Sequence, residues 1–464
     1  MNDCHDFIII GSGAGGSVMA RELCTQGAKV LLLEAGSHYR GSDYPRNEML
    51  SAAKLMWGGG AEMSADASTI LLRGKAVGGG TVVNQALLDR FDDIAWRDFK
   101  AESGVSFFTS EAMDPHYDAV EAQLALHTFD DRQEWNRNAV LYVEALEKLG
   151  YQWQPLRRAQ AGCDGHDCIV CLGGCPRDAK QSMNVTFLQA ACNDGLRIVA
   201  DVLVGEIVEG KDCVAVHARQ HGQSRVFYAR RCILSAGALG TSELLLRSGY
   251  ARRLPALGKY FYCHPQWMST AMCDEIVDAH KGSFQAAKSA DPRLRDWRFK
   301  LENVFAGPMS IAMLNHHHLG REHQQYMADY RRMMCIEVSL REQTPGEITL
   351  TKHGRLSVKK TLNHADLARA AKGRELVHEL FLAAGAKNIM HSDIRIGLHL
   401  MGGARLGQNA GDSVVDEGFR LHGSDKLYVA DGALFANAPG INPSLSIMAL
   451  AHRAARTIID NLPR

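Results

Sequence analysis

The stretch FIIIGSGAGG, residues 7–16, decides the fold of this chain. An apolar run of strand length at residues 7–10 is followed directly by a turn rich in glycine. In a turn of this kind Gly11 permits the tight bend, Gly13 lets a pyrophosphate approach the backbone, and Gly16 allows a helix to pack closely on the strand. The free N–H groups of that helix then face the pyrophosphate. The stretch therefore predicts the start of a dinucleotide-binding domain.

The second strand supports this prediction. It is KVLLLEAG at residues 29–36, and its acid, Glu34, follows Gly16 by 18 residues. An acid at this place accepts hydrogen bonds from both ribose hydroxyls and repels a 2′-phosphate, so NADP is disfavoured. Ala14, where the helix is expected to begin, belongs to the same predicted cofactor loop. These residues alone leave FAD and NAD open.

The size and charge of the chain limit its class. At 464 residues it exceeds the length at which a single core usually stops growing, so more than one domain is expected. Lys plus Arg equal Asp plus Glu at 52 each, which disfavours nucleic acid and anionic membranes as partners. The acidic N-terminus lacks the features of a signal peptide, and no apolar run reaches the length of a membrane span. We expect a cytoplasmic protein with no membrane span.

A second glycine-rich loop follows at residues 73–84, RGKAVGGGTVVN. Its three consecutive glycines have no Cβ, so the backbone can lie against a flat or charged ligand. Arg73, Gly78, Gly79 and Asn84 are the candidates for cofactor binding in this loop.

The last candidates lie near the far end of the chain. HLMGGARLG at residues 399–407 precedes the strand LYVADG, which ends at Asp431 and Gly432. Asn442 followed by Pro443 predicts the N-cap and first residue of a closing helix, because proline at that position loses no helix hydrogen bond. The positive end of this helix would support negative charge on a reduced flavin.

These motifs, with GALGTSELLLRSG at residues 237–249, resemble those of the glucose-methanol-choline (GMC) oxidoreductases, in the same order along nearly the whole chain. The resemblance implies an α/β fold with a discontinuous Rossmann-type FAD-binding domain and a substrate domain built on an antiparallel sheet. The predicted parts are residues 1–95, 191–261 and 399–464 for the FAD-binding domain, 96–190 for a linking and cysteine-rich segment, and 262–398 for the substrate domain.

The resemblance also assigns site residues. It places His399 and Asn442 over the flavin ring, Glu34 at the adenosine ribose, Val204 at the adenine and Asp431 near the flavin tail. Val83 stands where some relatives carry a flavin-linked histidine, so we expect non-covalent FAD. The full set of predicted cofactor-binding residues is Gly11, Gly13, Ala14, Gly16, Glu34, Arg73, Gly78, Gly79, Asn84, Val204, Asp431, Gly432 and Pro443.

Oxidation of a CH–OH group requires removal of the hydroxyl proton while a hydride leaves the carbon. A histidine suits proton removal because its unperturbed pKa is about 6.5, and an asparagine amide can orient the hydroxyl and stabilise a developing alkoxide. We therefore expect His399 as base and Asn442 as its partner in an FAD-dependent dehydrogenase or oxidase of a small-molecule alcohol. His264 is a weaker candidate for lining the pocket. A flavin-dependent desaturase or reductase, or a flavoprotein that only relays electrons or senses redox state, are the alternatives.

Cysteines crowd one segment, CDGHDCIVCLGGCP at residues 163–176. Cys168, Cys171 and Cys175 match the last three cysteines of a ferredoxin-type C-x2-C-x2-C-x3-C-P run, and Cys163 could substitute for the first. The spacing favours a [4Fe-4S] or [3Fe-4S] cluster, with zinc or a structural thiol cluster as alternatives. A cluster would pass electrons to a carrier protein, whereas without one dioxygen or a quinone would reoxidise the flavin directly.

Overall fold

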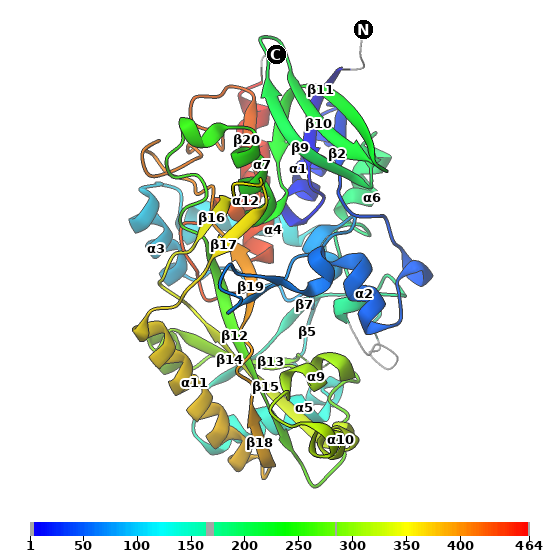
Figure 1. Ribbon diagram of the computed structural model, residues 1–464, viewed down its shortest axis with the longest axis vertical. Helices are drawn as coiled ribbons and strands as arrows, with labels where there is room; N and C mark the ends of the chain where they lie inside the picture. The colour runs from blue at the N-terminus through cyan, green and yellow to red at the C-terminus, as the bar shows by residue number, and fades with distance from the viewer. Residues whose placement is uncertain (1–3, 164–170, 284, 463–464) are drawn as a thin grey trace.

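Two sheets, placed end to end, organise the chain (Figure 1). The computed structural model describes residues 4–163, 171–283 and 285–462. The first sheet lies at the end of the molecule where both termini are found, and the second sheet fills the opposite end (Figure 1). The fold is α/β. The part built on the first sheet is of the dinucleotide-binding type that the opening stretch predicts.

The first sheet contains the strands predicted on either side of the glycine turn. β1 pairs in parallel with β2 and with β11, and β20 extends the parallel part beside β11. β9, β10 and β11 form an antiparallel meander. The order across the sheet is β8 (Arg197–Val199), β2 (Val30–Leu33), β1 (Cys4–Ile10), β11 (Gln223–Leu234), β10 (Val214–Gln220) and β9 (Val202–Glu209), with β20 (Leu427–Val429) beside β11.

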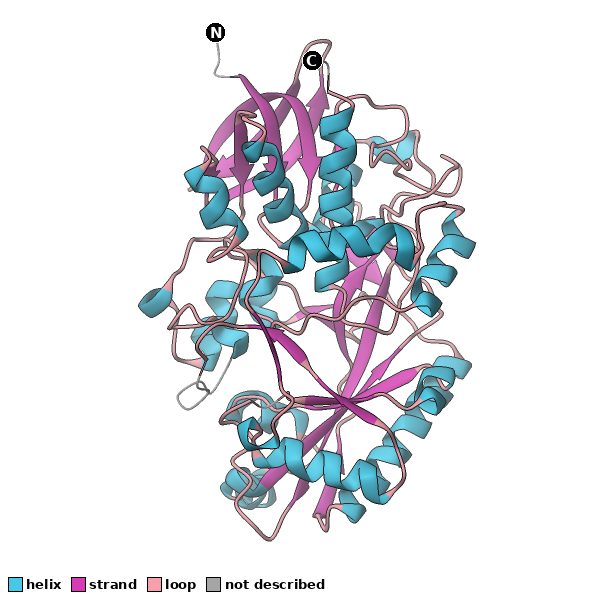
Figure 2. Ribbon diagram, turned by 180° about the vertical axis from the view of Figure 1, so that it is seen from behind, coloured by secondary structure: helices cyan, strands magenta, loops and turns pink. Residues whose placement is uncertain are grey.

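Helices cover this sheet (Figure 2), and they come from both ends of the chain. α1 (Ala14–Thr25) packs against α12 (Ser444–Asp460) and α6 (Phe187–Asn193), and α12 also packs against α4 (Ser110–Glu121). The apolar positions of α12 recur at helical spacing and are buried: Leu445, Met448, Ala451, Ala455 and Ile458. Burial of this stripe holds the last helix on the first one.

The second sheet is mainly antiparallel. Its central strand is β12, which pairs with β15 on one side and with β19 and β18 on the other. The order is β3 (Glu62–Met63), β4 (Ile70–Leu71), β19 (Ile396–Met401), β12 (Tyr262–Met272), β15 (Met333–Leu340), β14 (Phe299–Asn303), β13 (Ala287–Ser289) and β6 (Trp153–Pro155), with β18 (Lys387–His391) beside β12.

The two faces of the second sheet differ in chemistry. α11 (His364–Ala383) and α5 (Arg137–Lys148) pack against β14 and β15, and a Cβ on Gly373 of α11 would meet Val338. Because side chains alternate along a strand, the residues on either side of Val338 point to the other face. Glu337 and, on β14, Lys300 and Glu302 are therefore directed away from α11.

Several helices begin with a side-chain N-cap. Asp92, Asn136 and Asn363 each accept a hydrogen bond from a backbone N–H in the first turn of the helix that follows, as N-caps do. The other helices are α2 (Glu48–Leu55), α3 (Asp93–Ser103), α7 (Gly237–Arg247), α8 (Pro292–Asp296), α9 (Pro308–Leu314) and α10 (Gly320–Ala328). The other strands are β5 (Leu126–Thr128), β7 (Arg157–Ala159), β16 (Glu347–Leu350) and β17 (Leu356–Lys359).

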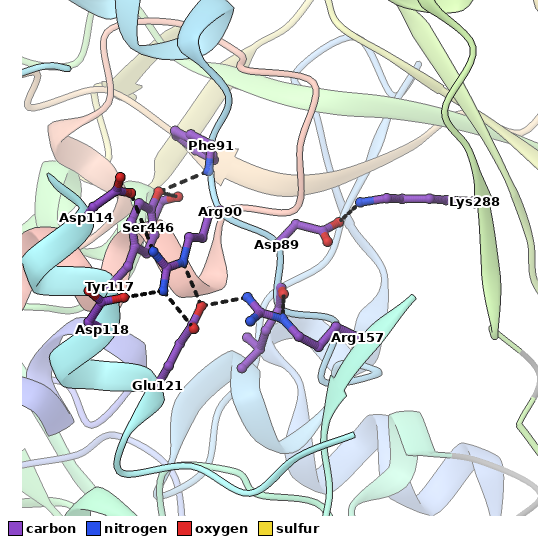
Figure 3. Close-up of polar contacts among 11 residues, drawn as sticks. Asp89, Arg90, Phe91, Asp114, Tyr117, Asp118, Glu121, Arg157, Lys288 and Ser446 are labelled. Carbon is purple, nitrogen blue, oxygen red and sulfur yellow. Dashed lines mark hydrogen bonds and ion pairs between the residues drawn. The ribbon is translucent and has the colours of Figure 1, made fainter. Parts of the chain in front are cut away.

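An extended segment ties the two halves together (Figure 3). Asp89 forms an ion pair of 2.7 Å with Lys288 of β13 in the second sheet. The next residue, Arg90, reaches Glu121 of α4 at 2.9 Å. Glu121 also pairs with Arg157 at 2.6 Å. These contacts fix the second sheet relative to the helices of the first.

Candidate active site

A cavity of about 1570 Å³ is lined by residues of both sheets. Of the residues predicted from sequence, those on its wall are Gly11, Gly13, Ala14, Glu34, Arg73, Gly79, Asn84, Val204, His399, Asp431, Gly432, Asn442 and Pro443. Gly16 and Gly78 are not on the wall. The structure thus brings both glycine loops, the His399 segment and the Asn442 segment to one place.

The glycines of the first turn divide into two kinds. A Cβ on Gly11 would lie 2.3 Å from the Ser235 carbonyl oxygen, and one on Gly16 would lie 2.0 Å from the Gly11 carbonyl oxygen. These two positions need glycine because the backbone is packed against them. A Cβ on Gly13 would meet nothing within 4 Å. Gly13 leaves open space at the start of α1, where an anionic group is favoured by the helix dipole, and this space fits a cofactor pyrophosphate.

Glu34 lies at the end of β2 and is buried. One carboxylate oxygen accepts hydrogen bonds from the Ser12 backbone N–H at 3.0 Å and from the Ser12 hydroxyl at 2.6 Å, and the other accepts from the Gly36 N–H at 2.8 Å. Burial raises the pKa of Glu34. Ser12, which the sequence motif does not single out, therefore links the predicted ribose acid to the glycine turn.

The second glycine loop lies on the first. The backbone N–H of Gly78 donates to the Ser12 hydroxyl at 2.9 Å, and a Cβ on Gly79 would lie 2.6 Å from the Gly13 Cα. Gly78 has a positive φ of 102°. It does not line the cavity itself, but it belongs to the loop that does. Gly79 opens the short 3-10 helix Gly79–Val82.

Other predicted cofactor residues are already engaged by the protein. Arg73 makes two hydrogen bonds of 2.7 Å with Glu62 and lies over the ring of Trp57. Asp431 accepts from the backbone N–H groups of Gly237 and Ala433, each at 2.8 Å. Burial raises the pKa of Asp431 to about 6.

His399 is joined to two further groups. Its Nδ1 lies 2.9 Å from Nδ1 of His264, whose Nε2 accepts the Gly440 backbone N–H at 2.9 Å. Since Nε2 of His264 accepts, its ring proton is on Nδ1 and is donated to His399. A neutral His399 then carries its own proton on Nε2, the nitrogen left for the cavity. In this arrangement His399 is a hydrogen-bond donor to a ligand.

The surroundings of His399 keep it neutral. Burial, and then the charge of Lys300, lower the pKa of His399 to about 3. Its backbone has a positive φ of 55°. For a residue other than glycine this conformation is uncommon and is found often at functional sites.

Asn442 is held by Lys300. The ammonium group of Lys300 donates to Oδ1 of Asn442 and lies 2.7 Å from a carboxylate oxygen of Glu302. A lysine ammonium can only donate, so the amide oxygen must face it and the amide NH2 is turned the other way. Asn442 therefore presents a donor, as His399 does.

The predicted N-cap role of Asn442 is wrong. α12 begins at Ser444, and the residue before it, Pro443, already has helical backbone angles and gives no side-chain cap. The side chain of Asn442 is bonded to Lys300 instead. Its amide is thus kept for the cavity and not for the helix end.

Two buried acids continue this network. Glu302 of β14 and Glu337 of β15 are direct cross-strand partners. Gln285 donates to Glu302 at 3.1 Å. Burial, and then the charge of Glu302, raise the pKa of Glu337 well above its usual range, which favours its neutral form.

The sequence motifs do not indicate Lys300, Glu302 or Glu337, and they make His264 only a weaker candidate for lining the pocket. The available signal was polar residues at alternate positions within two runs that also contain buried apolar residues, Lys300 and Glu302 in FKLEN at residues 299–303 and Glu337 and Ser339 in MMCIEVSL at residues 333–340. Buried charges of this kind are usually paired.

Part of the cysteine segment lines this cavity, through Leu172, Gly173, Gly174 and Pro176. Lys180 donates to the backbone oxygens of Cys171, Val82 and Asn84, at 2.7, 2.6 and 2.8 Å. Arg158 lies 3.2 Å from the Cys171 sulfur. The segment is thereby bonded to the second glycine loop.

The predicted iron-sulfur ligands are only partly within the described residues. Cys163, Cys171 and Cys175 line one small pocket, and Cys168 lies outside the described residues. Among residues 4–163, 171–283 and 285–462, no group of three or more His, Cys, Asp or Glu side chains is placed to hold a metal ion. In that same part of the chain, no helix has the length and apolar character needed to cross a membrane.

Known proteins resemble this chain over nearly its whole length. The long-chain-alcohol oxidase FAO4B of Arabidopsis thaliana is 26% identical and the match covers 98% of this chain and 67% of that protein. The cholesterol oxidase of Mycobacterium tuberculosis (strain CDC 1551 / Oshkosh) is 24% identical, with 98% and 91% covered. The crystal structure of pyridoxine 4-oxidase from "Mesorbium loti" has a TM-score of 0.79 at 17% identity and covers 99% of this chain and 100% of its own.

Family models give the assignment. The model for an NAD(P)-binding Rossmann-like domain matches residues 9–54. Two models described as GMC oxidoreductase match residues 52–266 and residues 342–451, which together are more than half of the chain. The chain therefore belongs to the GMC oxidoreductase family.

Proposed function

We propose that this protein is an FAD-dependent oxidoreductase that converts a CH–OH group of a small-molecule alcohol into a carbonyl. The observation that carries the proposal is the meeting of His399 and Asn442, each presenting an N–H donor, on the wall of a cavity that also contains the dinucleotide-binding turn. Proteins of this family bind FAD, and relatives are named for oxidation of long-chain alcohols and cholesterol.

The predicted cofactor residues fit FAD. Gly13 and the N-terminus of α1 leave space for the pyrophosphate, Glu34 would hold the adenosine ribose, and Asn442 and Pro443 lie where the ring would meet α12. When bound, FAD supplies the acceptor for the hydride that leaves the substrate carbon. Val83 at the position of the flavin-linked histidine supports non-covalent binding.

In this proposal the substrate oxygen lies between His399 and Asn442. The amide NH2 of Asn442 donates to that oxygen and favours the developing alkoxide. His399 is the candidate to take up the hydroxyl proton at Nε2. To accept a proton at Nε2, His399 must carry its own proton on Nδ1 and donate it to Nδ1 of His264. The proton of His264 must then be on Nε2. With the Gly440 bond in place, His399 instead donates from Nε2 and assists Asn442, and the hydroxyl proton must then be taken up by water.

His399→Ala and His399→Gln distinguish the two roles, since Gln can donate a hydrogen bond but cannot accept a proton. If His399 is the base, both variants should lose about 10²- to 10⁴-fold in the anaerobic rate of flavin reduction. If it is only a donor, Gln should recover most of the Ala loss. A desaturase, a reductase or an electron relay would be indicated if no alcohol reduces the wild-type flavin.

We infer that the cysteine segment decides the electron acceptor. Its bonds through Lys180 to Val82 and Asn84 place it beside the second glycine loop. An iron-sulfur cluster held by Cys163, Cys168, Cys171 and Cys175 would direct electrons to a carrier protein. Iron and acid-labile sulfide near zero in protein purified without air would argue instead for a structural thiol cluster and for direct reoxidation by dioxygen or a quinone.

A further inference from the structure

The cavity contains a polar floor, in which Lys300 and Glu302 hold Asn442 while Gln266 and Glu337 have no part in the proposed oxidation of a single hydroxyl. Along β12, β15 and β14, the side chains on the face opposite α11 follow the strand register: Gln266 is opposite Ser339, and Ser339 is opposite Lys300. In the next row, Glu337 is opposite Glu302. Gln266, Glu302 and Glu337 line the cavity.

The polar side chains of this floor are buried, and their burial costs free energy of folding. Gln266 is 1% exposed, Glu302 1% and Glu337 3%. Burial of polar groups in an apolar interior is unfavourable unless they find partners. A cavity meant only for an aliphatic chain would be expected to have apolar residues at these positions.

One polar atom of the floor lacks a partner. Gln266 donates from its NH2 to the Ser339 hydroxyl at 3.3 Å, and its Oε1 has no hydrogen-bond partner among the described residues although it is fully buried. An unmet acceptor of this kind on a cavity wall is expected to bind a donor from the ligand.

The charges of the floor balance among themselves. Lys300 is paired with Glu302, and burial raises the pKa of Glu337 well above its usual range, which favours its neutral form. The floor is therefore close to neutral, and it offers acceptors and donors without a net charge that would attract an ammonium or a carboxylate. A hydroxyl, which both donates and accepts, suits it best.

We propose that this floor binds a second hydroxyl of the substrate, so that the enzyme prefers uncharged diols and polyols to monohydric alcohols of the same length. The inference rests on the proposed oxidation of CH–OH groups and specifies its substrate class. Because Lys300 contacts both Glu302 and Asn442, the second hydroxyl would lie a short carbon chain away from the one being oxidised.

The test compares n-hexanol, the hexanediols, a hexitol and an aminohexanol as reductants of the FAD-loaded protein in anaerobic stopped-flow measurements. These give the limiting rate of reduction and the apparent Kd separately. At least one diol or the hexitol should exceed n-hexanol by about 10- to 100-fold in the ratio of rate to Kd, which is the effect expected for leaving a buried polar group unpaired. Equal values for all the alcohols, or a preference for n-hexanol or for the aminohexanol, would overturn the inference. Failure of every alcohol to reduce the flavin would instead refute the proposed function.

Two substitutions on β12 assign the preference to the floor. Gln266→Leu should abolish most of the advantage of the diol and leave reduction by n-hexanol within a few-fold. Met268 also lines the cavity from the same strand face, so Met268→Leu should change the diol and n-hexanol by the same factor. Glu337→Gln keeps a neutral donor beside Glu302 and should retain the preference. Loss of the preference in Met268→Leu but not in Gln266→Leu would contradict the assignment.

Discussion

Replacement of Lys300 by methionine should reverse the amide of Asn442. In the structure the ammonium group lies between the amide oxygen of Asn442 and the carboxylate of Glu302. Once it is removed, the carboxylate becomes the nearest strong acceptor, and the amide NH2 of Asn442 is expected to turn towards it. The cavity then faces an oxygen in place of a donor.

The magnitude follows from the loss of that donor. Removal of one donor to a developing oxyanion costs about 2.7–4 kcal/mol, which at about 1.4 kcal/mol per decade is 10²- to 10³-fold in the rate of flavin reduction. The double variant Lys300→Met/Glu302→Gln also lacks the carboxylate towards which the Asn442 amide NH2 would turn. The Asn442 amide then has no strong preference for either orientation, and the rate of flavin reduction should return to within about 10-fold of wild type.

The assay is anaerobic flavin reduction by a fixed alcohol, with thermal unfolding measured in parallel because breaking a buried ion pair costs about 3–5 kcal/mol. The matched control is Lys288→Met. Lys288 lies on the neighbouring strand opposite Glu302 but pairs with Asp89, so its loss should leave the rate within a few-fold. Equal activity of Lys300→Met and Lys288→Met, or a double variant as slow as Lys300→Met, would contradict this prediction.

Three further predictions concern the cofactor turn, pH and the cysteines. Gly13→Ala should lower FAD occupancy without lowering the melting temperature of the apoprotein, because its Cβ would enter only open space. Gly16→Ala should destabilise the apoprotein by about 1–3 kcal/mol, because its Cβ would lie 2.0 Å from a backbone oxygen. Equal melting temperatures of the two apoproteins would contradict this prediction. Because the pKa of His399 is lowered to about 3, its contribution to stability should be present above about pH 6.5 and lost as the pH falls towards 3, and His399→Gln should flatten that part of the unfolding profile. Cys171→Ser and Cys175→Ser should each lower the iron content if a cluster is present, and iron that stays unchanged in both variants would exclude these thiols as ligands.

The cofactor half of the site can be predicted from sequence because its signals are local. Gly11, Gly13 and Gly16 lie in one turn, and their spacing reflects contacts within a single strand, turn and helix. Even there, sequence could not separate Gly13, which leaves space, from Gly16, which packs against backbone.

The substrate half depends on strand register, which is not local. Glu302 and Glu337 are 35 positions apart in the sequence and meet only because β14 and β15 pair in one particular register. The donor character of Asn442 depends on Lys300, a residue of another strand. The sequence motifs identify His399 and Asn442 as catalytic candidates. They do not identify the neighbouring residues, such as Lys300, that determine which atoms of the candidates face the substrate.

The packing of α12 on α1 has a consequence for how the protein is made. β1 and the glycine turn are synthesised long before β20 and α12, which complete their sheet and cover their helix. Until α12 has been made, α1 lacks one of the helices that it packs against. We therefore expect the nascent chain to acquire FAD affinity only after α12 has been synthesised, and to need protection from aggregation until then.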